Sequence, residues 1–107
     1  IGGYDPSQLT GAGAEFVKKY KAKFQKDPEA YAVYGYEAAK VVLTAVKAVG
    51  KKDREAIRKA VLATKDFEAG ALDKWGFDAD GDTTLQQLTV SKIEGGKFKP
   101  LKVVTAG

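Results

Sequence analysis

The side chains that most often carry out covalent chemistry are scarce in this sequence. Its 107 residues include no Cys and no His, which removes the usual thiolate nucleophile, the commonest general base and the commonest metal ligand. Ser7 and Ser91 have no base placed to activate them, and no pair of carboxylates recurs on one rigid element. The sequence therefore predicts a protein that binds rather than an enzyme, with no cofactor.

One acidic cluster has the composition of a cation site. Asp78, Asp80 and Asp82 alternate around Gly81. An EF-hand calcium loop needs Gly at its sixth position and Glu at its twelfth. Here Gly81 is the fourth residue counted from Asp78, and no Glu follows at the required spacing. We expect a polar turn between short strands and no metal site.

Five lysines fall on one side of a segment whose other side is apolar: Lys18, Lys19, Lys21, Lys23 and Lys26. The net charge of +4 permits an anionic partner, but 14 acidic residues are interspersed among 18 basic ones. Base readout would also need aromatic or amide side chains between the lysines. A solvated helix face without nucleic acid is the favoured interpretation, and an independent basic helical module that binds nucleic acid or anionic surfaces is the alternative function.

The most apolar stretch, Asp27–Gly50, predicts a long helix that the rest of the chain must cover. Asp27 is a favoured N-cap, Pro28 suits the first helical position, and Gly50 suits the left-handed residue after the last turn. We expect the few polar side chains along one narrow side, at Glu37, Lys40, Thr44 and Lys47. A helix that is apolar nearly all round is buried over most of its circumference.

Two shorter helices are expected beside it. The first, Ala14–Gln25, follows a loop at Ile1–Gly13 and carries an apolar stripe at Phe16, Val17, Tyr20 and Phe24. The second, Arg54–Ala63, is capped by Asp53 and is expected to face inward through Ile57, Ala60, Val61 and Leu62. Phe67 is expected to anchor the loop that follows.

The end of the chain predicts a β-hairpin. Leu85–Glu94 and Lys97–Val104 have strand-forming residues, and Gly95-Gly96 between them suits a two-residue turn. Pro100 cannot donate to a ladder, so it is expected at an edge or a bulge. The expected class is α/β, with three helices followed by an antiparallel hairpin.

In this order the elements resemble the C-terminal part of a type I periplasmic binding protein of the leucine/isoleucine/valine-binding family, which serves ABC importers. The resemblance covers nearly the whole chain and rests on four motifs: the helix Glu15–Phe24 before Asp27-Pro28, Tyr31 with Tyr36-Glu37-Ala38, Asp53 leading to Phe67-Glu68-Ala69-Gly70, and Gly76-Phe77-Asp78 leading to Gly95-Gly96-Lys97-Phe98. The segment Asp73-Lys74-Trp75 departs from the family pattern.

The resemblance implies two α/β lobes around a cleft, joined by three crossing strands. Residues 1–107 would be a single fragment, with residues 1–84 the helical part of the first lobe and residues 85–107 a hairpin near the hinge. The implied function is that of an extracytoplasmic solute-binding component for amino acids or related small carboxylates, located in the periplasm or anchored to a membrane as a lipoprotein. Its implied partners are the small-molecule ligand, a membrane permease, and the remainder of the parent chain or a second copy.

The resemblance also implies a ligand site at the start of the long helix. An aromatic residue at the position of Tyr31 faces the cleft in this family, and Tyr34 lies one turn further on. Helix N-termini often face ligand clefts in α/β folds. Tyr36 points to another side and is expected in the core. Trp75 is expected to be a half-buried loop aromatic, and Tyr4 is expected near the hinge.

Overall fold

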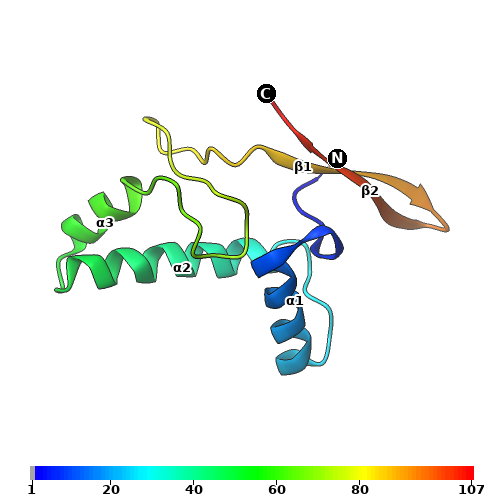
Figure 1. Ribbon diagram of the computed structural model, residues 1–107, viewed down its shortest axis with the longest axis horizontal. Helices are drawn as coiled ribbons and strands as arrows, with labels where there is room; N and C mark the ends of the chain where they lie inside the picture. Colours follow the sequence, from blue (N-terminus) through cyan, green and yellow to red (C-terminus); the bar gives the residue numbers. More distant parts are fainter. Residues whose placement is uncertain (1) are drawn as a thin grey trace.

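The computed structural model describes residues 2–107, and these form a short 3-10 turn, three α-helices and one antiparallel pair of strands. In chain order the elements are η1 (Pro6–Gln8), α1 (Gly11–Phe24), α2 (Ala32–Val49), α3 (Arg54–Leu62), β1 (Gln87–Glu94) and β2 (Lys97–Thr105). Figure 1 shows α3 folded back beside α2, α1 projecting from the start of α2, and the hairpin lying across the other side. The predicted class and element order are confirmed.

The helix α2 begins later than its sequence predicts. Tyr31 occupies the N-cap position, and residues 29–32 form a turn in which the Ala32 amide donates to the Glu29 carbonyl at 3.0 Å. Asp27 does not cap the helix, because it lies four residues before the N-cap Tyr31; its carboxylate instead pairs with Lys21 on α1 at 2.7 Å. The C-terminal prediction is confirmed, since Gly50 has φ 69° and its amide donates to the Val46 carbonyl.

One face of α2 is buried, and this face is not wholly apolar. Its buried residues are spaced by four, at Val33, Glu37, Val41 and Ala45. The expectation that Glu37 lies on an exposed polar side was wrong, because only 3% of it is accessible. The opposite side carries Leu43, which is 64% exposed. Residues 2–107 therefore cover one side of this helix and leave an apolar side open.

The carboxylate of Glu37 connects α2 to the long loop before the hairpin. Its two oxygens accept hydrogen bonds from the Ala71 amide and the Trp75 indole, both at 2.7 Å. A Cβ on Gly70 would lie 1.9 Å from the nearer Glu37 oxygen, so only glycine lets the loop approach so closely. The loop is therefore shaped around a buried acid rather than around apolar contacts alone.

Trp75 lies deeper than its sequence context predicts. It is 8% exposed and makes edge-to-face contacts with Phe67 and Phe77, at centroid distances of 5.9 and 5.1 Å. With Val41 these aromatics form one of two core clusters. The predicted role of Phe67 as a loop anchor is confirmed.

Three further expectations about the helices need correction. Tyr36 is 42% exposed rather than in the core, although its ring packs 5.0 Å from that of Phe16 on α1. Leu62, expected to face inward, is 45% exposed because it lies at the open end of α3. α1 begins at Gly11 rather than Ala14, and η1 forms within the predicted loop.

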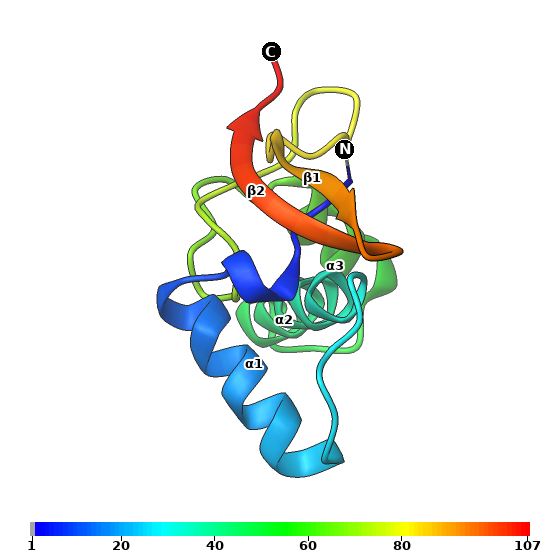
Figure 2. The same cartoon turned by 90° about the vertical axis from the view of Figure 1, so that its right-hand side faces the viewer.

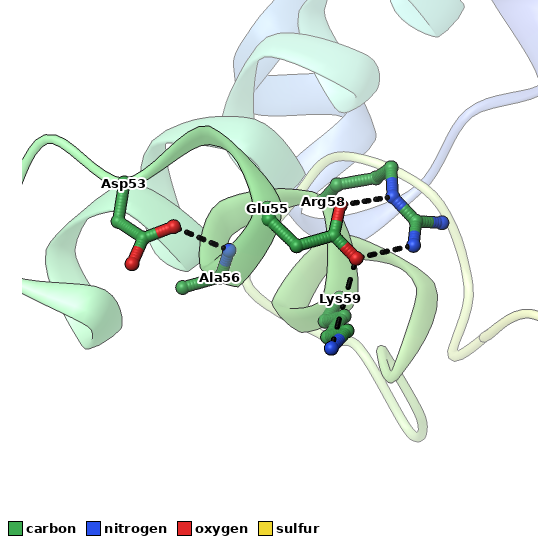
Figure 3. Close-up of polar contacts among 5 residues, drawn as sticks. All are labelled: Asp53, Glu55, Ala56, Arg58 and Lys59. Carbon is green, nitrogen blue, oxygen red and sulfur yellow. Dashed lines mark hydrogen bonds and ion pairs between the residues drawn. The ribbon is translucent and has the colours of Figure 1, made fainter.

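The start of α3 confirms its predicted cap. An Asp53 oxygen accepts from the Ala56 amide at 2.9 Å, as Figure 3 shows. In the same first turn Glu55 accepts two hydrogen bonds from Arg58 and lies 3.6 Å from Lys59. The hydrogen bonds from Arg58 hold the pKa of the Glu55 carboxyl below its usual range. These exposed pairs support the helix locally and contribute little to overall stability.

The aspartate cluster forms the predicted polar turn. One Asp78 oxygen accepts from the amides of Asp80 and Asp82, both at 2.9 Å, and Gly81 supplies a φ of 87°. One oxygen of the Asp78 carboxylate is therefore engaged by the turn itself. Within residues 2–107 no three potential metal-binding side chains come together.

The hairpin follows its predicted turn and irregularity. Gly95 and Gly96 have φ of 60° and 73°, as a two-residue hairpin turn requires. The pairing shifts between Val90 and Ser91, so that Ser91 faces Pro100 and Leu101 is the extra residue of a bulge. The prediction that Pro100 marks an edge or a bulge is confirmed.

Candidate functional site

A pocket of about 260 Å³ lies where the start of α2, the N-terminal segment and the hairpin meet. Figure 2 shows the N-terminal segment running between the hairpin and α2. Tyr31 and Tyr34 both line this pocket, so the structure brings together the two residues chosen from the sequence. Their rings lie 6.2 Å apart at 46°. The ligand role of either residue stays a prediction at this point.

Tyr31 and Tyr34 contribute different surfaces to the pocket. Tyr31 is 82% exposed at the N-cap of α2, so its ring is a free apolar surface with a polar tip. Tyr34 is partly buried, and its hydroxyl accepts a hydrogen bond from the Tyr4 amide at 2.8 Å. A Cβ on Gly3 would lie 2.5 Å from that hydroxyl, so the N-terminal segment passes directly against it.

The N-terminal segment is held from three sides. Its Tyr4 side chain is buried and donates to a carboxylate oxygen of Asp73 at 2.8 Å. Its Asp5 amide donates to the hydroxyl of the buried Thr89 on β1 at 3.2 Å, and Gly2 exchanges two backbone hydrogen bonds with Thr89. Burial and the Asp73 hydrogen bond raise the pKa of the Tyr4 phenol above its usual value. The segment thereby joins α2, the loop and the hairpin around the pocket.

Sequence reasoning missed the pocket residues that the hairpin supplies. Thr89 and Ser91 on β1 and Phe98 on β2 line the pocket from this side. Ser91 drew attention only as a possible nucleophile, and nothing local marked Phe98. The paired strands and glycine turn could have predicted which residues share a hairpin face. That this face lies beside the start of α2 depends on contacts far apart in the sequence.

The lysines of α1 do not form a uniform row of unpaired positive charges. Lys21 pairs with Asp27, and Lys23 lies 5.8 Å from the ring centroid of Phe24.

Along residues 2–107, none of the helices is both long enough and apolar enough to cross a bilayer.

A small aromatic pocket beside a helix start is typical of a protein that binds small molecules. The chain belongs to the periplasmic binding protein family, whose pattern it matches over residues 2–97. It is 36% identical over 84 residues to a Leu/Ile/Val-binding protein homolog of Brucella suis and 33% identical over 85 residues to one of Brucella abortus. These matches cover 78% and 79% of this chain and 22% of each relative.

Solved structures show the same fold. The leucine-binding protein LivK of Thermotoga maritima has a TM-score of 0.80 and 30% identity, over 95% of this chain and 29% of that one. LivJ of Streptococcus pneumoniae, a branched-chain amino acid transporter substrate-binding protein solved with isoleucine, has a TM-score of 0.81 and 27% identity, over 97% and 29%. An ABC transporter solute-binding protein of R. palustris with benzoate has a TM-score of 0.77 at 24% identity, over 95% and 28%, and supports the fold alone. The chain thus spans less than a third of these proteins, and the resemblance drawn from its motifs is confirmed.

Proposed function

We propose that these residues form part of the solute-binding component of an ABC importer, which captures an amino acid or a related small carboxylate outside the cytoplasm. The observation that carries the proposal is the pocket at the start of α2, where Tyr31 and Tyr34 present aromatic surface to a small cavity. The names of the relatives support it, since they are Leu/Ile/Val-binding homologs and leucine- or isoleucine-binding proteins.

The role is binding without chemistry. Aromatic rings with hydroxyl tips give a ligand apolar contact and orientation, and the chain offers no His or Cys to attack it. Residues 1–84 belong to the first lobe in this proposal, and residues 85–107 cross at the hinge. Closure of two lobes around the ligand would produce the form that a membrane permease accepts. Anchoring as a lipoprotein is compatible with this arrangement and is part of the proposal.

The test uses the full-length protein in which these residues occur, titrated calorimetrically with leucine, isoleucine, valine and benzoate. We expect saturable binding of at least one of the four. Replacing Tyr31 by Ala should weaken that binding by about 1–3 kcal/mol, the value of burying one large apolar side chain.

Tyr36→Ala is the matched control, because Tyr36 lies on the same helix and packs on Phe16 outside the pocket. This variant should melt earlier and bind normally. A Tyr31→Ala protein that binds normally but melts early would make Tyr31 a packing residue and refute the site. Turnover of an ester, peptide or phosphate that survives repurification and is lost on mutation of one carboxylate would refute the binding-only role.

A further inference from the structure

Phe98 lies in the wall of the pocket that contains Tyr31 and Tyr34, although it belongs to β2 near the other end of the chain. Its side chain is 78% exposed. The pocket therefore has aromatic surface from the hairpin as well as from the start of α2. We propose that Phe98 contacts the ligand and, with the two tyrosines, encloses its apolar part. This inference rests on the proposed function.

The hairpin register fixes where Phe98 points. The Gly95-Gly96 turn pairs Ile93 directly with Phe98, and residues directly opposite in an antiparallel pair project to the same face. Ser91 precedes Ile93 by two residues and therefore lies on this face, where it too lines the pocket. Backbone pairing thus places Phe98 on the hairpin face that carries Ser91, and of the Ile93–Phe98 pair it is Phe98 that lines the pocket.

The N-terminal segment holds this face of the hairpin against α2. Thr89 lies on the same face of β1. Its backbone exchanges two hydrogen bonds with the Gly2 backbone, and its hydroxyl accepts one from the Asp5 amide. The Tyr4 amide in the same segment donates to the Tyr34 hydroxyl. These hydrogen bonds connect β1 to Tyr34 through the N-terminal segment. The pairing of β2 with β1 then fixes the position of Phe98 relative to Tyr34.

The lining residues indicate which part of a ligand this wall accepts. Four of its lining residues are aromatic, and the one formal charge among its described residues is the carboxylate of Asp5. A ligand carboxylate finds no cationic side chain among them and is expected to point away. The volume of about 260 Å³ falls just below the usual range for ligand pockets. The wall therefore suits one branched aliphatic group or one aromatic ring.

The test compares hairpin variants of the full-length protein, titrated with the same four compounds. Phe98→Ala should weaken binding at least about tenfold, as expected for the loss of one aromatic contact surface. Phe98→Leu should restore part of the affinity because it restores apolar surface. Ile93→Ala is the matched control: Ile93 is the cross-strand partner of Phe98 and is 72% exposed, but it does not line the pocket. Its affinity should change less than about twofold.

The outcomes separate this inference from the proposed function. If the unmodified protein binds none of the four compounds, the proposed function fails. If Tyr31→Ala weakens binding and Phe98→Ala does not, the site stands and the role of Phe98 is refuted. An equal loss in Ile93→Ala and Phe98→Ala would show that both act through hairpin folding, which also refutes the contact.

Discussion

At the residue scale, Tyr4 connects the pocket to the loop beneath it. Its amide donates to the Tyr34 hydroxyl, and its own phenol donates to Asp73. The phenol is buried, so its ionised form would lose water and repel the Asp73 carboxylate. Both effects favour the neutral phenol in the folded protein, which makes folding sensitive to alkaline pH.

We therefore expect Tyr4 to lower stability above its ordinary pKa of 10.0. The folded-state pKa is raised, so the contribution is fully present below pH 10 and is lost as the pH rises toward the folded-state pKa. Urea melts of the full-length protein between about pH 8 and 11 should show a steeper fall in unfolding free energy for the unmodified protein than for Tyr4→Phe, by at most about 1.4 kcal/mol per pH unit.

The exposed Tyr31 provides the control for this titration. Tyr31→Phe makes the same substitution at a side chain that is 82% exposed, and it tests whether the loss of any phenol changes the slope. If Tyr4→Phe and Tyr31→Phe have the same slope, Tyr4 is not held neutral by the fold.

At the scale of elements, α2 and the loop after α3 are joined by the buried carboxylate of Glu37. It satisfies two donors, the Ala71 amide and the Trp75 indole, that would otherwise be buried without partners. Unpaired buried donors are costly, because they lose water without gaining another acceptor. The acid therefore stabilises the loop by a specific arrangement of hydrogen bonds, which apolar packing against Val41 alone would not provide.

Glu37→Gln should lower the unfolding free energy by about 2 kcal/mol, because the new amide retains one acceptor and faces the second donor with an N–H group. Near-ultraviolet circular dichroism should show a looser aromatic environment, because Trp75 loses a hydrogen-bond acceptor. Glu29→Gln is the control, since Glu29 is an exposed acid next to the same helix. Equal stability of the two variants would contradict a structural role for the Glu37 hydrogen bonds.

The same elements show which features the sequence could predict. The Asp53 cap, the Gly50 terminus and the Gly95-Gly96 turn depend on neighbouring residues, so local patterns were sufficient. The start of α2 was misplaced because Asp27, a good cap in isolation, is followed by a turn that delays the helix to Ala32. Nothing in helical periodicity identifies a distant partner, so the burial of Glu37 could not be predicted.

The residues of the candidate site also divide into those that local sequence could predict and those that depend on distant contacts. Tyr31 and Tyr34 could be predicted as ligand-contacting residues, because they lie at the start of a helix that the sequence motifs match to the periplasmic binding protein family. Phe98 could not be chosen, because its contact with the pocket requires the hairpin and α2 to be placed relative to each other.

At the scale of the whole molecule, residues 2–107 form an open arrangement. The radius of gyration is 15.6 Å, whereas a compact domain of 100 residues has about 13 Å. The principal extents are 51 × 36 × 21 Å, and Figure 1 shows α1 and the hairpin extending away from α2. The pocket is correspondingly bounded by few elements, and Tyr31 remains almost fully accessible.

We expect the 107-residue chain alone to bind no free amino acid with useful affinity. The wall that it provides leaves the ligand mostly in water, whereas small-molecule sites usually bury most of the ligand surface. Calorimetry against leucine, isoleucine and valine should give no heat beyond dilution. The full-length protein under the same conditions is the positive control. A saturable micromolar response from the 107-residue chain would show that these residues form a complete site.

The open side of α2 leads to a prediction about assembly. Val42, Leu43 and Val46 are 45%, 64% and 41% exposed on one helix, and a contiguous apolar surface of this kind is rarely left in water. In the two-stranded hairpin Gly2 pairs with the outer edge of β1 only at Thr89, and the edge of β2 can pair with another chain. We therefore expect the isolated 107-residue chain to self-associate through α2, with exchange of the hairpin between copies as one route.

Light scattering over a dilution series tests this, because a chain of 11.4 kDa should give a larger mass that falls on dilution. Leu43→Lys places a charge on the apolar side and should shift the population toward monomer. Thr44→Lys adds the same charge at the neighbouring exposed polar position and should leave the mass unchanged. A compact monomer at low micromolar concentration, with cooperative melting that does not depend on concentration, would show that the three helices and the hairpin close their own core. The exposed side of α2 would then be tolerated in water and would need no partner.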